Sequence, residues 1–99
     1  MGKVNSPETE SLVKAILSLE SEEECFSFFE DICTIKEIQD MSQRFQVAQM
    51  LNQNKRYIEI SQITGASTAT ISRVNKCLNY GSDGYRRALE KMSDKEAAR

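Results

Sequence analysis

The chain has 99 residues, of which 39% are hydrophobic and 28% charged, and its formal net charge is −2. This length allows a single domain over 1–99 with a modest core, and the composition is typical of a folded soluble protein. No apolar run is long enough to cross a membrane. Three cysteines without a Cys-x-x-Cys pair, and no histidine, argue against a metal site and indicate reduced thiols in a cytoplasmic protein.

Charge is distributed unevenly along the chain. Residues 1–40 carry three basic and ten acidic side chains, whereas residues 41–91 carry eight basic and three acidic ones. Such asymmetry indicates an acidic half that faces solvent and a basic half that meets a polyanion such as double-stranded DNA. Taken alone, the charge pattern is explained equally well by chance clustering on a solvated surface.

The first half of the sequence predicts three helices. The residues that cap these helices are Ser6, Ser21 and Thr34. Each is followed by acidic residues in the first turn and then by apolar residues at helical spacing. The third helix is expected to run through Leu51. Val47 and Met50 widen its apolar stripe so far that we expect a second subunit to cover it.

The second half predicts three more helices. Short helices are expected over 57–64 and 68–78, then a loop over 79–84, a last helix over 85–92 and a frayed polar tail over 93–99. No proline follows Pro7, so little interrupts a helical chain. The predicted fold is therefore all-α, with about six helices.

The two short helices have the spacing of a helix-turn-helix unit over 57–78. Gly65 tolerates positive φ at the tight turn, and Ser67 is placed to cap the second helix. The side chains expected to face inward are Ile60, Ile63, Ala66, Ile71, Val74 and Leu78. The opposite face of the second helix is small, hydroxylated and basic, which suits close approach to base edges in the major groove. The alternative is an ordinary helical hairpin with a solvated outer face.

We expect the contacts of this unit to divide between bases, which give specificity, and phosphates, which set register. The side chains expected at the bases are Thr68, Ala69, Ser72 and Arg73. Those expected at the phosphates are Arg56, Ser67, Lys76, Arg86 and Arg87.

The segment Gly65–Arg73 reads Gly-Ala-Ser-Thr-Ala-Thr-Ile-Ser-Arg and resembles the recognition segment of the Trp repressor superfamily, Gly-Ala-x-x-Ala-Thr-Ile-x-Arg. The following stretch, 74–87, is similar to the Trp-repressor-like YerC/YecD branch, and the resemblance covers about residues 10–92. The resemblance implies that the protein is a bacterial transcriptional repressor and forms an intertwined homodimer. It also implies that the helix over 68–78 reads DNA and that Tyr57 and Ser61 lie near the phosphate backbone.

The resemblance further implies a small-molecule corepressor held between two arginines. Arg73 matches one of them, and the other falls on Gln43 without a gap or, as we prefer, on Arg44 with one residue deleted. Val74 stands where the Trp repressor has glycine, and its side chain fills space that an indole needs, which argues against tryptophan as the ligand. The alternative, which we favour, has no effector: Arg44 is then a surface or interfacial residue and Arg73 a phosphate contact.

Two other classes of function compete with DNA binding. A helical dimeric protein-interaction module without DNA binding is the runner-up, supported by the acidic N-terminal half. We do not expect an enzyme, because the chain has no histidine and Cys33 lacks the cationic surroundings that activate a thiol.

Overall fold

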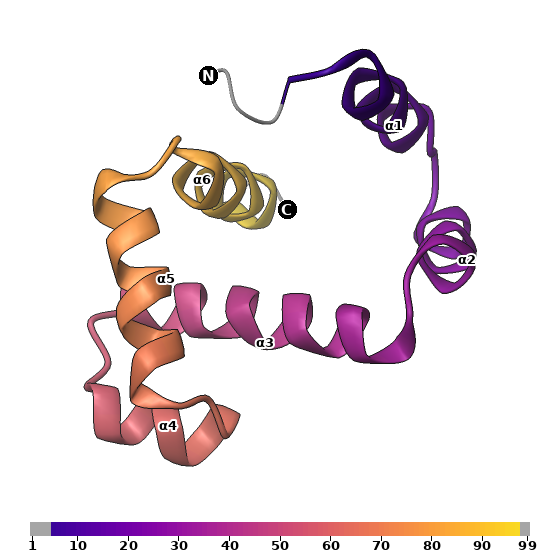
Figure 1. The fold of residues 1–99 in the computed structure, drawn as a ribbon. Coiled ribbons are helices and arrows are strands. Elements are labelled where there is room, and N and C mark those ends of the chain that lie inside the picture. The colour runs from indigo at the N-terminus through magenta and orange to yellow at the C-terminus, as the bar shows by residue number, and fades with distance from the viewer. Residues whose placement is uncertain (1–4, 98–99) are drawn as a thin grey trace. The chain divides into compact units, whose positions relative to one another are not determined.

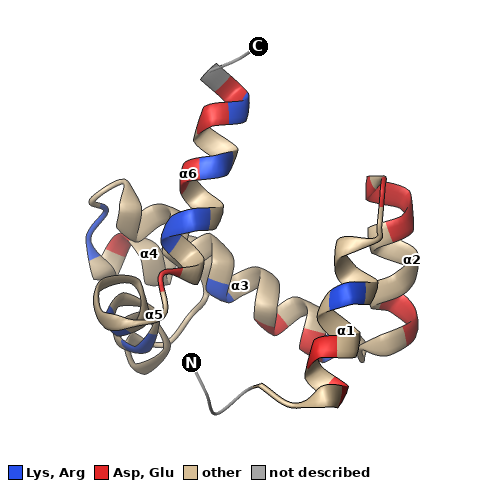
Figure 2. Ribbon diagram, turned by 90° about the horizontal axis from the view of Figure 1, so that it is seen from above, with Lys and Arg blue, Asp and Glu red and all other residues tan. Residues whose placement is uncertain are grey.

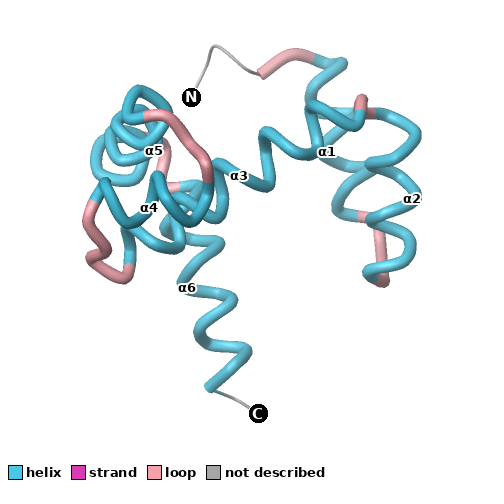
Figure 3. The backbone as a smooth tube through the Cα atoms, turned by 90° about the horizontal axis from the view of Figure 1, so that it is seen from below, coloured by secondary structure: helices cyan, strands magenta, loops and turns pink. Residues whose placement is uncertain are grey.

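The computed structural model describes residues 5–97, which form six helices and no strand (Figure 3). In chain order they are α1 Pro7–Leu17, α2 Glu22–Ile32, α3 Ile35–Asn52, α4 Tyr57–Thr64, α5 Thr68–Tyr80 and α6 Gly84–Ala97 (Figure 1). The predicted all-α class is confirmed. None of the helices in this part of the chain has the length and apolar character needed to span a membrane.

The first three helices begin where the capping residues predict. The hydroxyl oxygens of Ser6 and Ser21 each accept a hydrogen bond, 3.1 Å long, from the backbone N–H three residues further on. Thr34 and Glu37 form a reciprocal capping box: Thr34 Oγ1 accepts from the Glu37 N–H at 3.1 Å, and Glu37 Oε1 accepts from the Thr34 N–H at 2.8 Å. These bonds satisfy donors that the first turn of a helix leaves unpaired.

Contacts group the chain into two compact units, one up to Ile38 and one from Gln39 onwards. In the first unit, α1 and α2 contain no buried side chain. Seven of the large apolar side chains of this unit are exposed, and Leu17 is 78% exposed; the others are Leu12, Val13, Ile16, Phe26, Ile32 and Ile35. Taken by itself, this unit therefore leaves apolar surface uncovered.

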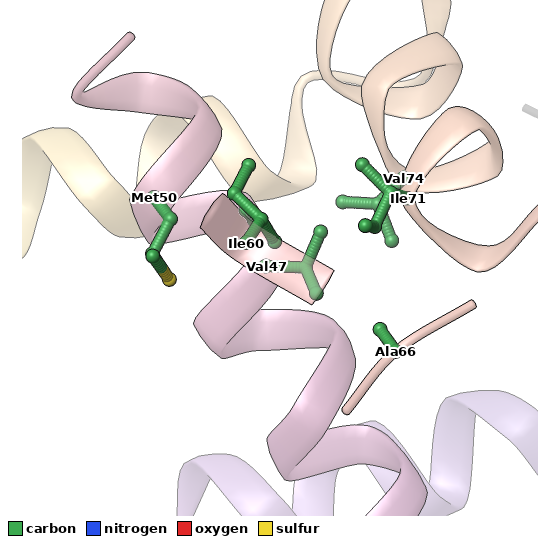
Figure 4. Packing of buried hydrophobic residues seen from close by; sticks show 7 residues of the cluster. Val47, Met50, Ile60, Ala66, Ile71 and Val74 are labelled. Atoms are coloured by element: carbon green, nitrogen blue, oxygen red, sulfur yellow. The ribbon is translucent and has the colours of Figure 1, made fainter. Parts of the chain in front are cut away.

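The second unit holds the hydrophobic core (Figure 4). The core combines side chains from α3, α4, the turn after α4 and α5: Val47, Ala48, Met50, Ile60, Ala66, Ile71 and Val74. Tyr85 at the start of α6 packs against this cluster, and its ring stacks on Phe45 of α3 with centroids 6.4 Å apart. The core thus ties the two short helices and α6 to one end of α3.

The expectation that a second subunit covers Val47 and Met50 is wrong. Val47 is fully buried and Met50 is 8% exposed within the chain itself. Both belong to the cluster that also contains residues of α4 and α5, such as Ile60 and Ile71. A wide apolar stripe shows only that a helix must be covered, and here later helices of the same chain cover the part of α3 that contains Val47 and Met50.

Two helices extend beyond their expected ends. Helix α5 continues to Tyr80, and α6 runs from Gly84 to Ala97 rather than ending at Met92. Good helix formers fill α6 beyond Tyr85, and neither proline nor glycine interrupts them. Most of the tail that was expected to fray is therefore helical, and residues 98 and 99 lie outside the described part of the chain.

Candidate nucleic-acid interface

The turn between α4 and α5 has the backbone conformation that the sequence predicts. Gly65 ends α4 with φ 76° and ψ 3°, in the left-handed region, and its N–H donates to the Ser61 carbonyl at 2.9 Å. This is the usual position for glycine at a helix C-terminus, because residues with a Cβ adopt it at a cost.

Polar side chains fasten this turn from both sides. The Ser61 hydroxyl donates to the Ala66 carbonyl at 2.9 Å, and Thr64 Oγ1 accepts from the Ala66 N–H at 3.1 Å. From α3, Gln43 Nε2 donates to the Thr64 carbonyl at 3.1 Å. Sequence reasoning missed Thr64 and Gln43 as supports of the turn. A threonine beside a helix-ending glycine is a local signal, whereas Gln43 is distant in the sequence and gives none.

Helix α5 divides into a buried and an exposed face, as its periodicity predicts. Ser67 caps the helix, since its Oγ accepts from the Thr70 N–H at 3.1 Å. Ile71, Val74 and Leu78 are buried. The exposed side chains include those of Thr68, Ala69, Ser72, Arg73 and Lys76. Helix α5 contains no acidic residue, whereas α1 and α2 carry most of the acidic ones among the helices (Figure 2).

The prediction that Ile63 faces inward is wrong, because this side chain is 58% exposed. In α4 the fully buried side chain is Ile60, and Ser61 and Thr64 are half-buried. At 100° per residue, Ile63 lies about 100° from the middle of the side that these three define. This helix of only two turns thus places Ser61 and Thr64 toward the turn and exposes two isoleucines, Ile58 and Ile63, to solvent.

The remaining residues expected near phosphates differ in their availability. Arg56, Lys76 and Arg87 are exposed, and Tyr57 lies at the margin of exposure. The Ser61 hydroxyl is engaged with the turn, and Ser67 both caps α5 and donates to Thr70 Oγ1 at 3.1 Å. Arg86 is also exposed, but its guanidinium is hydrogen-bonded to the end of α5. Their contacts with DNA stay predictions.

The structure brings Arg44 and Arg73, the two arginines that the family resemblance implies for an effector site, to one pocket. This pocket has a volume of about 190 Å³ and is lined by Asp40, Gln43, Arg44, Thr70, Arg73 and Val74. Both candidates for the second arginine position, Gln43 and Arg44, therefore face the same space as Arg73. Val74 is 2% exposed and is also part of the core cluster, so its side chain occupies room at the inner end.

The turn at Gly65, the capped helix α5 and its exposed basic face together define a helix-turn-helix unit within an all-helical chain. The profile of the family described as Trp repressor protein matches residues 8–93. The chain belongs to the Trp repressor family.

Individual relatives agree with this assignment. The chain is 51% identical over 94 residues to the uncharacterized protein YerC of Bacillus subtilis (strain 168). The aligned region covers 95% of this chain and 90% of YerC. A crystal structure of a TrpR-like protein from Eubacterium eligens superposes with a TM-score of 0.90, 53% identity and coverage of 94% of this chain and 96% of that one. The crystal structure of a proposed Trp repressor from Staphylococcus aureus superposes with a TM-score of 0.87 and is 49% identical in sequence. That match covers 92% of this chain and 91% of the other. The predicted fold class and family resemblance are confirmed.

Proposed function

We propose that this protein is a sequence-specific DNA-binding transcriptional regulator, acting as a repressor, that reads the major groove with α5. The observation that carries the proposal is the exposed face of α5. This face presents small, hydroxylated and basic side chains, while the apolar side of the same helix is held in the core. Small side chains allow close approach to base edges, and the lack of acidic residues in α5 favours a polyanionic partner.

Contacts on this face divide by chemistry. Thr68, Ala69 and Ser72 are placed to meet base edges, with hydroxyls for hydrogen bonds and a methyl group for thymine. Arg73 reaches a guanine or a phosphate. Three of the exposed cations outside this group serve the phosphate backbone and set register: Arg56, Lys76 and Arg87. Tyr57 and Ser67 lie at the N-termini of α4 and α5 and contribute further phosphate contacts.

The regulator acts as an intertwined homodimer. Support comes from the first unit, which has exposed apolar side chains and no fully buried side chain in α1 and α2, and from membership of the Trp repressor family. Two copies of α5 then enter successive major grooves about 34 Å apart on a near-palindromic site. The protein works in the cytoplasm, where its three thiols stay reduced.

Selection of binding sites from random duplexes, followed by affinity measurements at several salt concentrations, tests this function. Ser72→Ala is expected to relax preference at one base position of each half-site, at a cost of roughly 1–3 kcal/mol for each base that the side chain no longer reads. Lys76→Ala is expected to weaken binding to all sequences and to make the salt dependence less steep, because fewer counterions are released. A Lys76→Ala protein that loses preference at one base position only would contradict the assigned role.

A helical protein-interaction module is the second candidate, and the exposed apolar side chains of the first unit favour it. The two functions differ in a simple measurement. A DNA reader is retained on heparin or random DNA at low salt and released as salt rises, since phosphate contacts release counterions. An interaction module without DNA binding is not retained.

The pocket between Arg44 and Arg73 is the site where a small effector would bind. Two guanidinium groups beside Asp40 and Gln43 suit a small anionic or zwitterionic molecule. Because Val74 takes up room that an indole needs, we expect tryptophan to give no thermal stabilisation. Thermal unfolding with individual amino acids at millimolar concentration measures this, and a rise in Tm with tryptophan would contradict it.

A further inference from the structure

Arg86 lies in the first turn of α6, and its side chain reaches back to the end of α5. Its Nε–H donates to the Leu78 carbonyl at 2.8 Å, and its Nη2 donates to Asn79 Oδ1 at 3.0 Å. The Leu78 carbonyl is among the last four of α5, which have no partner within the helix. A cation at this position also faces the negative end of the helix dipole. Arg86 thus serves as a C-terminal cap delivered by another helix.

Neighbouring bonds extend this cap along α5 and into the loop. The Asn79 amide donates to the Asn75 carbonyl at 2.9 Å, so that Asn79 joins Arg86 to the preceding turn of the helix. The Gly81 N–H donates a hydrogen bond to the Cys77 carbonyl at 2.8 Å, and a Cβ on Gly81 would collide with that carbonyl. The connection between the two helices is therefore short and closely fitted.

Helix α6 is itself anchored to the core. Tyr85, the residue before Arg86, packs against the buried cluster and stacks on Phe45 of α3. A continuous set of contacts then runs from α3 through Tyr85 and Arg86 to the end of α5. The orientation of α5 decides whether its exposed side chains reach base edges, because base contacts need defined hydrogen-bond geometry.

We propose that Arg86 is a positioning residue that sets the orientation of the reading helix α5, and that it is not a phosphate ligand. The inference rests on the proposed DNA binding. It replaces the phosphate contact that the sequence alone suggests for Arg86, because the guanidinium is committed to the end of α5. Arg87 is adjacent and of the same charge, and both arginines are exposed. The difference between them is that the Arg86 guanidinium is hydrogen-bonded to the end of α5, so Arg87 keeps the expected role at the phosphates.

The test compares Arg86→Ala with the matched variant Arg87→Ala in the full-length protein. For Arg86→Ala we expect affinity for the selected site to fall about tenfold, which corresponds to the loss of one hydrogen bond to a charged group. The slope of log affinity against log salt concentration is expected to stay unchanged. For Arg87→Ala we expect the slope of log affinity against log salt to become less steep by about 0.9 for each phosphate that the protein no longer neutralises. Arg86→Lys keeps the charge and supplies one donor group in place of the planar fork, and is expected to restore only part of the affinity.

Two further measurements separate positioning from general stability. Amide hydrogen exchange without DNA is expected to speed up in the last turn of α5 in Arg86→Ala and Asn79→Ala, but not in Arg87→Ala. In DNA affinity, the Arg86→Ala and Asn79→Ala changes are expected to be non-additive, because the two side chains share a bond.

A flattened salt slope in Arg86→Ala, or unchanged exchange at the end of α5, would overturn the inference. If the unaltered protein shows no salt-dependent DNA binding, the proposed function fails and the reading role of Arg86 fails with it. The exchange measurement still reports, independently, whether Arg86 caps α5.

Discussion

Gly65 occupies a backbone conformation that residues with a side chain adopt only at a cost, with φ of 76°. A Cβ placed there would meet only Gln43 Nε2, at 4.0 Å, so that space is not limiting and the cost lies in the backbone itself. The turn therefore depends on one residue for its conformation, while the hydroxyls of Ser61 and Thr64 supply its hydrogen bonds.

We predict that Gly65→Ala lowers the free energy of unfolding by about 1 kcal/mol and that Gly65→Val lowers it further, because a β-branched residue is strained at positive φ. DNA affinity is expected to fall with the distorted turn, while helix content is retained. Urea unfolding followed by circular dichroism measures the change as a shift in midpoint. Gly84→Ala is the matched control, since Gly84 lies in α6 with open space around its Cα and is expected to be neutral or slightly stabilising. Equal destabilisation by the two alanines would contradict the role of positive φ at Gly65.

Helix α4 gains its orientation from a single buried side chain. Ile60 is fully buried, and the polar residues Ser61 and Thr64 lie on the same side, toward the turn. Helix α5, in contrast, presents three buried apolar residues at regular spacing and is held along its length. The two helices of the reading unit are therefore fixed in different ways, α4 by one anchor and its hydrogen bonds and α5 by a full apolar face.

Two of the three isoleucines of α4, Ile60 and Ile63, provide a matched pair for testing this arrangement. We predict that Ile60→Ala lowers the free energy of unfolding by about 2–5 kcal/mol, because it leaves a cavity in the core. Ile63→Ala, the same change on the exposed side, is expected to cost less than about 1 kcal/mol. Chemical unfolding of both variants gives the comparison. If Ile63→Ala lowered the free energy of unfolding as much as Ile60→Ala, the Ile63 side chain would have to be covered in solution, which would contradict this arrangement.

The two units of the chain differ in burial and in charge. The second unit has a closed core, whereas the first has exposed apolar side chains and most of the acidic residues. Exposed apolar residues on a helix pair without a core are typical of a surface that is completed by another subunit. This division is consistent with the proposed function, in which the second unit reads DNA and the first mediates self-association.

We predict that the protein is a dimer in solution and that Leu17→Lys, on the exposed apolar surface of α1, weakens the dimer at least tenfold, because it places a charge in an apolar interface. Sedimentation equilibrium over a range of concentrations measures this. Tyr80→Lys is the matched control: Tyr80 is equally exposed but lies at the end of α5, and this change is expected to leave the dimer intact. A monomer in the unaltered protein, or a dimer insensitive to Leu17→Lys, would contradict the assignment.

The number of helices, the capping residues of the first three, the turn at Gly65 and the two faces of α5 could be predicted from the sequence alone. These features depend on residues a few positions apart, and local spacing records them directly. The packing of the helices was needed to show that Val47 and Met50 are covered by their own chain and that Ile63 faces solvent. It was also needed to show that Gln43 and Arg86 hold the two ends of the reading unit. Each of these outcomes depends on which elements pack together, and helical periodicity describes the sides of a helix without identifying the neighbour that covers each side.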